Sequence, residues 1–254
     1  VYKRQAKEFM KSLKKQGLDF KLSHKVTSTK AGKDGVDVTM ESVDNKAVKE
    51  KYDVVLMSIG RKPNTEGLNL EAIGIKLNEK KSIEINSKFK TSVEGIYAIG
   101  DVVPGPMLAH KAEEEGVACV ELISGQKPHI NYEMIPAIVY TNPEVASVGK
   151  TEAELKERKT DYKIGKFPFM ANGRALTTSS PEGFVKILAD SKTDAILGAH
   201  IIGHDAGQLI AEIVTTMEFG GSSEDIARIC HAHPTTSEAV KEAAMSIEGR
   251  AIHI

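Results

Sequence analysis

The chain of 254 residues is long enough to bury a sizeable core, in one large domain or two ordinary ones. Hydrophobic residues make up 41% of it and charged residues 27%, which is typical of a globular protein. The net charge of -1 gives no electrostatic footprint for nucleic acid or an anionic membrane. No apolar run approaches the ~20 residues that span a bilayer.

The cysteines and the first residue bear on the redox chemistry and the completeness of the chain. Cys119 and Cys230 lie far apart, so the sequence encodes neither a close redox pair nor a metal-ligand cluster. We expect both thiols to be buried and reduced, as in a reducing compartment. No signal peptide is visible. Because Val1 directly precedes a helical pattern, we expect an N-terminal part, with any targeting segment, to be missing.

The first elements in chain order are a helix and a small antiparallel sheet. Apolar residues recur at helical spacing over residues 5–16, and Gly17 follows as a stop signal. Three strands are predicted at 20–26, 36–40 and 48–51, with a turn at 31–35. Residues 52–60 form a continuous apolar run ending in glycine, which predicts a buried core strand with a sharp exit at 61–64.

The middle of the chain contains two motifs that suit a ligand. Residues 95–101 predict a short apolar strand ending in Gly-Asp, which brings a carboxylate to a sheet edge where ligands of open α/β folds bind. Residues 107–122 predict one long helix, and its unsatisfied first-turn amides would suit an electron-rich ligand edge. The polar residues 125–131 form a plausible boundary.

The second half predicts another antiparallel sheet, followed by helices. Strands are predicted at 136–143, 145–149, 162–168, 183–189 and 196–202, with a helix at 151–158 that has Glu154 in a capping box. Helices are predicted at 206–219, 223–229 and 235–247. The wide apolar stripe of the first of these three helices indicates a core face.

A histidine and a glutamate near the end form a candidate acid–base pair. His233 precedes a proline, so we expect it outside a helix whose first turn begins at Pro234 and which presents Glu238. The carboxylate could bind one ring nitrogen and leave the other free to take a proton, as a general base requires. On spacing alone, a plain turn residue is the commoner role for such a histidine.

Together with Ala98-Ile99-Gly100-Asp101 and Met107-Leu108-Ala109-His110-Lys111-Ala112, this pair resembles the flavin disulfide oxidoreductases, most closely the dihydrolipoamide dehydrogenases. The resemblance covers essentially the whole chain. It implies an α/β and α+β fold: remnants of Rossmann-like nucleotide-binding domains, then a C-terminal α+β dimerisation domain with an antiparallel sheet. It divides the chain into the C-terminal part of an NAD-binding domain (1–63), a central FAD-contacting segment (64–130) and an interface domain (131–254).

The resemblance also implies residue roles. His233 matches the family's base, and Glu238 matches the carboxylate that orients it. For the cofactors it implies Asp101 at the ribityl chain of FAD, Met107, Leu108, Ala109 and His110 beside the isoalloxazine, and Val26 and Gly60 as backbone positions near NAD. A helix cap for His110 and a core filler for Met107 are the plain alternatives. No metal ligands are implied.

In this family the enzyme oxidises dihydrolipoamide on a lipoyl-bearing carrier of 2-oxo acid dehydrogenase or glycine cleavage complexes. Electrons pass through a protein disulfide and FAD to NAD. The resemblance implies a homodimer with active sites shared between subunits, in the mitochondrial matrix or alternatively the bacterial cytoplasm. The sequence contains no Gly-x-Gly-x-x-Gly loop for a dinucleotide pyrophosphate and no close cysteine pair. We therefore expect this chain alone to be inactive.

Two alternatives remain at this stage. Glutathione and mercuric reductases share a His-Pro near the end, although the form His-Ala-His-Pro and the segment Gly-Pro-Met-Leu-Ala-His-Lys-Ala favour the lipoamide enzyme. The chain could also be a non-catalytic dimerisation module. Two glycine-rich fingerprints and a cysteine pair in the upstream coding sequence would indicate an enzyme.

Overall fold

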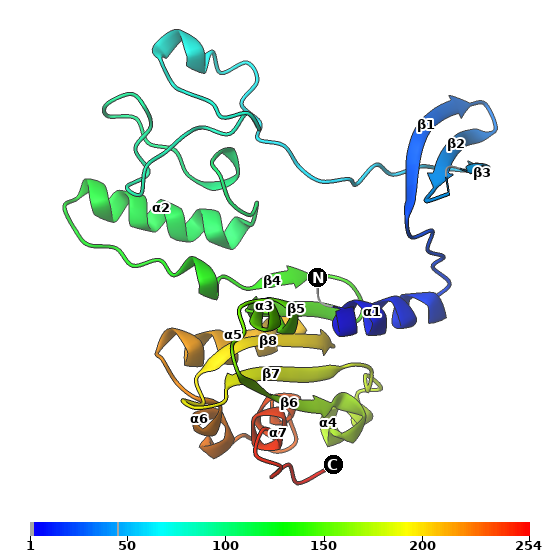
Figure 1. The fold of residues 1–254 in the computed structure, drawn as a ribbon, viewed down its shortest axis with the longest axis vertical. Coiled ribbons are helices and arrows are strands. Elements are labelled where there is room, and N and C mark those ends of the chain that lie inside the picture. The colour runs from blue at the N-terminus through cyan, green and yellow to red at the C-terminus, as the bar shows by residue number, and fades with distance from the viewer. Residues whose placement is uncertain (1–2, 45) are drawn as a thin grey trace.

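The computed structural model describes residues 3–44 and 46–254, which form two antiparallel sheets with helices around the larger one (Figure 1). The smaller sheet has the order β1-β2-β3. The larger has five strands in the order β4-β5-β8-β7-β6. The second predicted antiparallel sheet is thereby confirmed.

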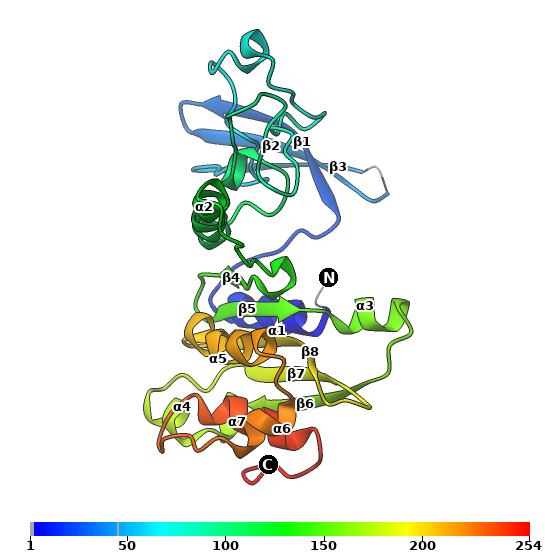
Figure 2. The same cartoon turned by 90° about the vertical axis from the view of Figure 1, so that its left-hand side faces the viewer.

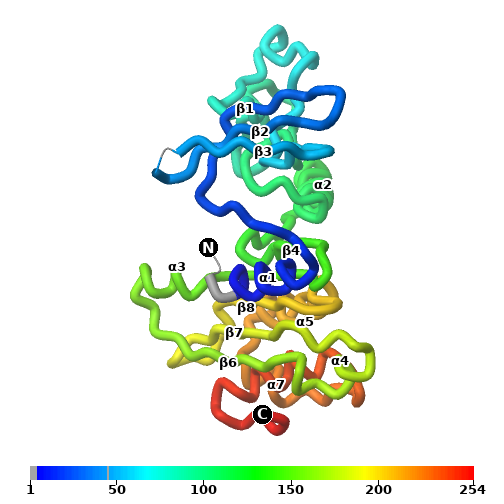
Figure 3. The backbone as a smooth tube through the Cα atoms, turned by 90° about the vertical axis from the view of Figure 1, so that its right-hand side faces the viewer, coloured from blue at the N-terminus to red at the C-terminus, as the bar shows by residue number. Residues whose placement is uncertain are grey.

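The first helix, α1 (Lys3–Lys15), confirms the prediction for residues 5–16 and packs on the larger sheet. The buried amide of Gln5 donates to the carbonyl oxygens of Ala146 at 3.1 Å and Ile201 at 2.8 Å. Figure 2 shows α5, α6 and α7 on one face of the five-stranded sheet, and Figure 3 shows α1 on the other. Both faces of that sheet are therefore covered in part by helices.

The smaller sheet is the predicted meander, with different strand limits. It consists of β1 (His24–Gly32), β2 (Gly35–Ser42) and β3 (Ala47–Tyr52). The first strand begins later than predicted and extends into the turn predicted at 31–35. The actual turn consists only of residues 33 and 34, which lie between Gly32 and its partner Gly35. A turn this short keeps the ladder paired to its end.

The prediction of a buried strand at 52–60 is wrong. β3 ends at Tyr52, and the residues after it run without strand pairing, with Val54 and Ile59 81% and 91% exposed. An apolar run becomes a core strand only where neighbouring strands satisfy its backbone groups on both sides. Among the described residues, none pairs with this segment.

The middle of the chain is built from turns around one long helix. A 3₁₀ helix η1 (Leu70–Ile73) is followed by two isolated bridges, Leu77 with Ile83 and Lys90 with Tyr97. The predicted strand at 95–101 is wrong, since its end forms the 3₁₀ turn η2 (Gly100–Val102). The predicted helix at 107–122 is confirmed as α2 (Ala109–Ile123).

The C-terminal unit, residues 132–254, contains the remaining elements. Its strands are β4 (Ala137–Val139), β5 (Glu144–Gly149), β6 (Tyr162–Pro168), β7 (Phe184–Asp190) and β8 (Ile196–Gly203). Its helices are η3 (Tyr132–Met134), α3 (Glu152–Glu157), η4 (Phe169–Ala171), α4 (Gly173–Thr177), α5 (Ala206–Glu218), α6 (Ser223–Arg228) and α7 (Glu238–Ser246). The predicted strand 136–143 is reduced to β4, α4 was not predicted, and α7 begins at Glu238 rather than at residue 234 or 235.

The core of the unit lies between the sheet and α5, α6 and α7. Strand residues Val185, Ile187 and Ile201 are fully buried against helix residues such as Ile213 and Val240. Strand alternation puts polar residues on the opposite face, where the paired Lys186 and His200 are also buried. The helix α3 covers part of this face, because its Glu152 forms an ion pair with Lys186.

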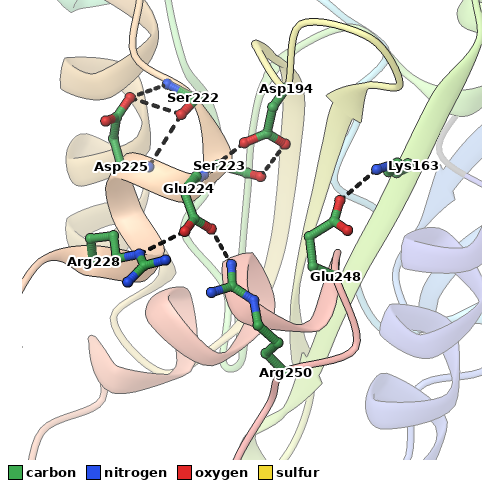
Figure 4. Close-up of polar contacts among 9 residues, drawn as sticks. All are labelled: Lys163, Asp194, Ser222, Ser223, Glu224, Asp225, Arg228, Glu248 and Arg250. Carbon is green, nitrogen blue, oxygen red and sulfur yellow. Dashed lines mark hydrogen bonds and ion pairs between the residues drawn. The ribbon is translucent and has the colours of Figure 1, made fainter.

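Polar contacts fix the ends of α6 and α7 to the strands (Figure 4). Asp194, in the turn between β7 and β8, accepts bonds from the Ser223 hydroxyl and the Glu224 amide at the start of α6. Glu224 in turn pairs with Arg228 and with Arg250 beyond α7. These contacts thus join the two helices to the turn that connects β7 and β8 at one end of the sheet.

Two further findings concern the cysteines and membranes. Cys119 is buried, as expected, but Cys230 is exposed and that expectation is wrong. Cys230 lies in the loop that follows α6, outside the packed helix face. Within residues 3–44 and 46–254, no helix combines the length and apolar character needed to cross a membrane.

Candidate active site

The candidate acid–base pair is formed as expected. His233 Nδ1 lies 2.9 Å from Glu238 Oε1. The histidine side chain is 74% exposed, while that of Glu238 is only 22% exposed. In the tautomer that carries its proton on Nδ1, the ring donates this hydrogen bond to the carboxylate, and Nε2 is left with a free lone pair. This arrangement can take a proton from a group that docks against the loop.

The loop also holds the carboxylate in its charged form. Partial burial opposes ionisation of Glu238, but hydrogen bonds from the Thr235 amide and from His233 outweigh it and lower the pKa of Glu238 below its usual value. A carboxylate that stays ionised stabilises the imidazolium formed when His233 takes a second proton.

The same contacts explain why α7 begins at Glu238. Glu238 Oε2 accepts the Thr235 N–H at 2.8 Å, and the Thr235 hydroxyl donates to the Ala232 carbonyl at 2.7 Å. Residues 234–237 are thus folded into turns outside the helix. Asn172, which caps α4, donates to the Thr235 carbonyl at 3.0 Å and fixes this turn to the core.

A second candidate site lies at the start of α2. The side chain of Asp101 is 47% exposed and faces Arg61, whose Nη1 lies 3.8 Å from Asp101 Oδ2. Gly100 has a φ of 72°, and a Cβ there would meet Ala112 Cβ at 3.1 Å. Only glycine allows this close approach to α2, so the Gly-Asp turn is fixed against the helix.

The first turn of α2 is open. Leu108 is its N-cap residue and makes no side-chain capping bond, so the first amides remain available to a ligand. Met107 lines a cavity of about 610 Å³ together with Arg61, Pro104 and Gly105. His110 Nε2 lies 2.8 Å from the Pro136 carbonyl, and this bond connects α2 to the chain before β4.

A buried ion pair that the sequence analysis did not single out supports this corner. Lys111 Nζ lies 2.9 Å from Glu115 Oε1, and both side chains are buried. Glu115 also accepts the Gly100 N–H at 2.7 Å and the Tyr132 hydroxyl at 3.0 Å. Burial, then the bond to Glu115, raises the pKa of Tyr132 to about 12. The i,i+4 spacing of lysine and glutamate was the sequence signal available for the pair.

The residues expected near NAD, Val26 and Gly60, are both exposed. Val26 is an exposed residue of β1. Gly60 lies in the exposed segment after β3 with a φ of 128°, a conformation that favours glycine. Neither position tests its expected role.

The structure does not bring the two candidate sites together. Figures 1 and 2 both show the five-stranded sheet lying between α2 and α7. Asp101, just before α2, and Glu238, at the start of α7, therefore belong to different regions of one chain.

The fold and these sites match one class of protein. The chain belongs to the pyridine nucleotide-disulphide oxidoreductases: the model of that family matches residues 1–116, and the model of the family's dimerisation domain matches residues 135–244. The expected fold class, a redox nucleotide-binding part followed by an α+β dimerisation domain with an antiparallel sheet, is thereby confirmed.

Within this class, similar proteins carry two names. The chain is 54% identical to the mitochondrial dihydrolipoyl dehydrogenase of Pisum sativum, over 98% of this chain and 50% of the relative. It is 55% identical to a leghemoglobin reductase of Glycine max, over 94% of this chain and 46% of the relative. The structure of LpdA from Mycobacterium tuberculosis superposes with a TM-score of 0.86 at 27% identity, over 96% of this chain and 52% of that one. The chain thus spans about half the length of the curated relatives it matches.

Proposed function

We propose that this chain carries the acid–base half of a dihydrolipoyl dehydrogenase. The observation that supports this is the hydrogen bond between His233 and Glu238, with the other ring nitrogen exposed. A thiol is a poor nucleophile until it loses its proton, so attack by a dithiol on a disulfide needs a base of this kind. The identity to the Pisum sativum enzyme supports the same assignment.

The geometry supports the proposed role of each residue. His233 Nε2 takes the proton of one thiol of dihydrolipoamide, and the resulting thiolate attacks a disulfide sulfur. Glu238 holds the ring by Nδ1 and balances its positive charge. Overall, the dithiol loses two electrons and two protons and becomes a disulfide. NAD⁺ takes both electrons with one proton as a hydride, and the other proton leaves to solvent through the base.

The residues of the α2 corner fit part of an FAD site. The exposed Asp101 carboxylate can accept bonds from ribityl hydroxyls, and the open first turn of α2 with Met107, Leu108, Ala109 and His110 suits the edge of the ring. When bound, FAD supplies the two-electron transfer between the disulfide and NAD. Val26 and Gly60 remain the proposed backbone positions near NAD, and 1–63, 64–130 and 131–254 the proposed domains.

The separation of the two sites supports an active site shared by two subunits. Because the five-stranded sheet lies between α2 and α7, His233 would act on the flavin and disulfide of a partner copy. The match to the family's dimerisation domain supports a homodimer. We propose a lipoyl-bearing carrier as the macromolecular partner. We also propose the mitochondrial matrix as the location, since the Pisum sativum relative is named as mitochondrial, with bacterial cytoplasm as the alternative.

The first test replaces the aligned half of the Pisum sativum enzyme with this chain and measures dihydrolipoamide-dependent NAD reduction. We expect the chimera to be active and the 254 residues alone to be inactive, since the only two cysteines in the chain are far apart. His233→Gln should lower the rate in the chimera by about 10²- to 10⁴-fold, the usual contribution of a general base.

The matched control is His204→Gln, at another exposed histidine paired with a carboxylate, Asp205. It should leave the rate unchanged. A flavin-loaded, dimeric chimera that did not oxidise dihydrolipoamide would contradict the proposed substrate, and a parallel assay with glutathione disulfide would then test the rival reductase. An active chimera unaffected by His233→Gln would contradict the role of the base.

A further inference from the structure

The histidine two residues before the base has a different environment from the base itself. The side chain of His231 is 6% exposed, in contrast to the open ring of His233. Its Nε2 lies 2.7 Å from Glu212 Oε1, and its Nδ1 lies 3.1 Å from the Ile229 carbonyl oxygen. His231 is therefore the residue of the His-Ala-His sequence that faces the protein.

The partner of His231 lies on a rigid element. Glu212 belongs to α5, whose residues Leu209 and Ile213 are buried in the main core. The Ile229 carbonyl, which His231 contacts, also accepts a hydrogen bond of 2.8 Å from Lys241 Nζ on α7. The backbone entering the base loop, residues 229–237, is thus connected to α5 and α7 together.

The chemistry of the two acceptors determines how the ring bonds. A carboxylate and a backbone carbonyl only accept hydrogen bonds, so each of them is a partner for a ring N–H of His231. The ring is therefore held between α5, through Glu212, and the backbone of its own loop, through the Ile229 carbonyl. The charged groups that face it in the described structure are Glu212 from α5 and, through the shared carbonyl, Lys241 from α7.

We propose that His231, paired with Glu212, is a positioning residue that fixes the backbone from which the base His233 projects. This proposal rests on the proposed function for the role of His233, but its geometry can be tested without catalysis. Glu238 holds the ring of the base from α7, and His231 holds the preceding backbone on α5. Two anchors on two helices leave the base little freedom to move away from a docked thiol.

A second histidine–glutamate pair on α5 provides a matched control. His129 Nε2 lies 2.6 Å from Glu218 Oε1, but the His129 side chain is 78% exposed and belongs to the segment before η3. The two pairs have the same chemistry and the same helix. They differ in whether the histidine enters the base loop.

The test is a set of ring-nitrogen NMR spectra of the 254-residue chain. His231→Gln and Glu212→Ala should shift the ring signals of His233 and change their pH profile, while His129→Gln leaves both unchanged. Glu212→Gln keeps an oxygen acceptor and should retain signals close to those of the unchanged chain. In the active chimera, His231→Gln should lower the rate about tenfold or more, since a shift of about 1 Å in a catalytic group can cost 10²-fold.

Unchanged His233 signals in folded His231→Gln and Glu212→Ala variants would overturn the proposal, as would equal shifts in the His129→Gln control. If His231→Gln failed to fold, the contrast between Glu212→Ala and Glu212→Gln would still decide it. Failure of the proposed function has a different signature. In that case the His233 signals respond to His231, but the chimera does not respond to His233→Gln.

Discussion

The C-terminal unit and the part of the chain before it use similar apolar sequences with different results. In the unit, strand residues such as Val185 and Ile201 are fully buried between sheet and helices. Before residue 131, the apolar run after β3 leaves Val54, Leu56 and Ile59 almost fully exposed. The difference lies in the partners: β7 pairs on both sides, while the run after β3 pairs with no strand among the described residues.

This comparison predicts a large difference in resistance to proteolysis. Arg61 lies in the exposed segment after β3, and its side chain projects into solvent. Cleavage there needs no unfolding, whereas cleavage within β7 or β8 requires the core to open. We expect trypsin to cut after Arg61 at least ~10³-fold faster than after Lys186, the tryptic site within β7, because core strands open only with global unfolding. Mass spectrometry of timed digests measures both rates.

Chain unfolded in urea provides the control, since the preference for Arg61 should disappear there. A first cut after Lys186 of the native chain would show that the C-terminal unit is no more stable than the segment before it. The proposed difference in stability between the two regions would then be wrong.

Local sequence patterns predicted those elements whose partners are close in the chain. The meander β1-β2-β3, the capping box of α3 and, apart from α4, the order of α-helices and strands after residue 144 follow from alternation, turns and caps. The run 52–60 was mistaken for a core strand because its composition suits one, and composition carries no information about which neighbours are present. Gly-Asp at residue 101 was mistaken for a strand end for the same reason.

The second prediction uses a histidine that is buried in the C-terminal unit. Burial, only partly offset by the bond to the Lys150 carbonyl, lowers the pKa of His200 from 6.5 to about 4. The folded state therefore favours the neutral ring. As the pH falls below 6.5 the unfolded chain takes up a proton that the folded chain does not, so stability is lost down to about pH 4. The full loss is about 3 kcal/mol, from 1.36 kcal/mol for each unit of pKa.

Urea unfolding of the chain between pH 8 and pH 4 measures this loss. His200→Gln should reduce the fall in stability, whereas His24→Gln, in β1 of the smaller sheet, should leave it in place. The same pH dependence in His200→Gln as in the unchanged chain would place the acid sensitivity elsewhere. His200 would then not be evidence that the two regions differ in burial and stability.

Contacts of the candidate site between residues close in the sequence could be predicted, whereas contacts between distant elements could not. Pro234 predicts that His233 lies outside the helix, and Glu238 follows five positions later, so a local pattern sufficed for the pair. Glu212 lies 19 residues before His231 on another helix, and only the packing of α5 against the base loop brings them together. The bond from Glu115 to the Gly100 amide likewise depends on how α2 meets the preceding turn.

The last prediction concerns the contact that places α7 on the sheet. A Cβ at Gly165 in β6 would overlap the Ala243 carbonyl oxygen and approach Ile247 Cγ1 to 2.6 Å. Gly165→Ala should push α7 away from β6 and lower the free energy of unfolding by about 1–3 kcal/mol, the usual range for an overpacked core. Urea unfolding measures the loss.

Gly173, the first residue of α4, is the matched control, because a Cβ there meets nothing within 4 Å. Gly173→Ala should leave stability unchanged or raise it slightly, since alanine favours the helix over glycine by up to about 1 kcal/mol. Because Glu238 is the first residue of α7, displacement of the helix should also shift the ring signals of His233 in Gly165→Ala. Equal stability of the two glycine variants would contradict the close packing of β6 and α7, and a loss of stability without a shift at His233 would show that the base is held by its loop rather than by the helix.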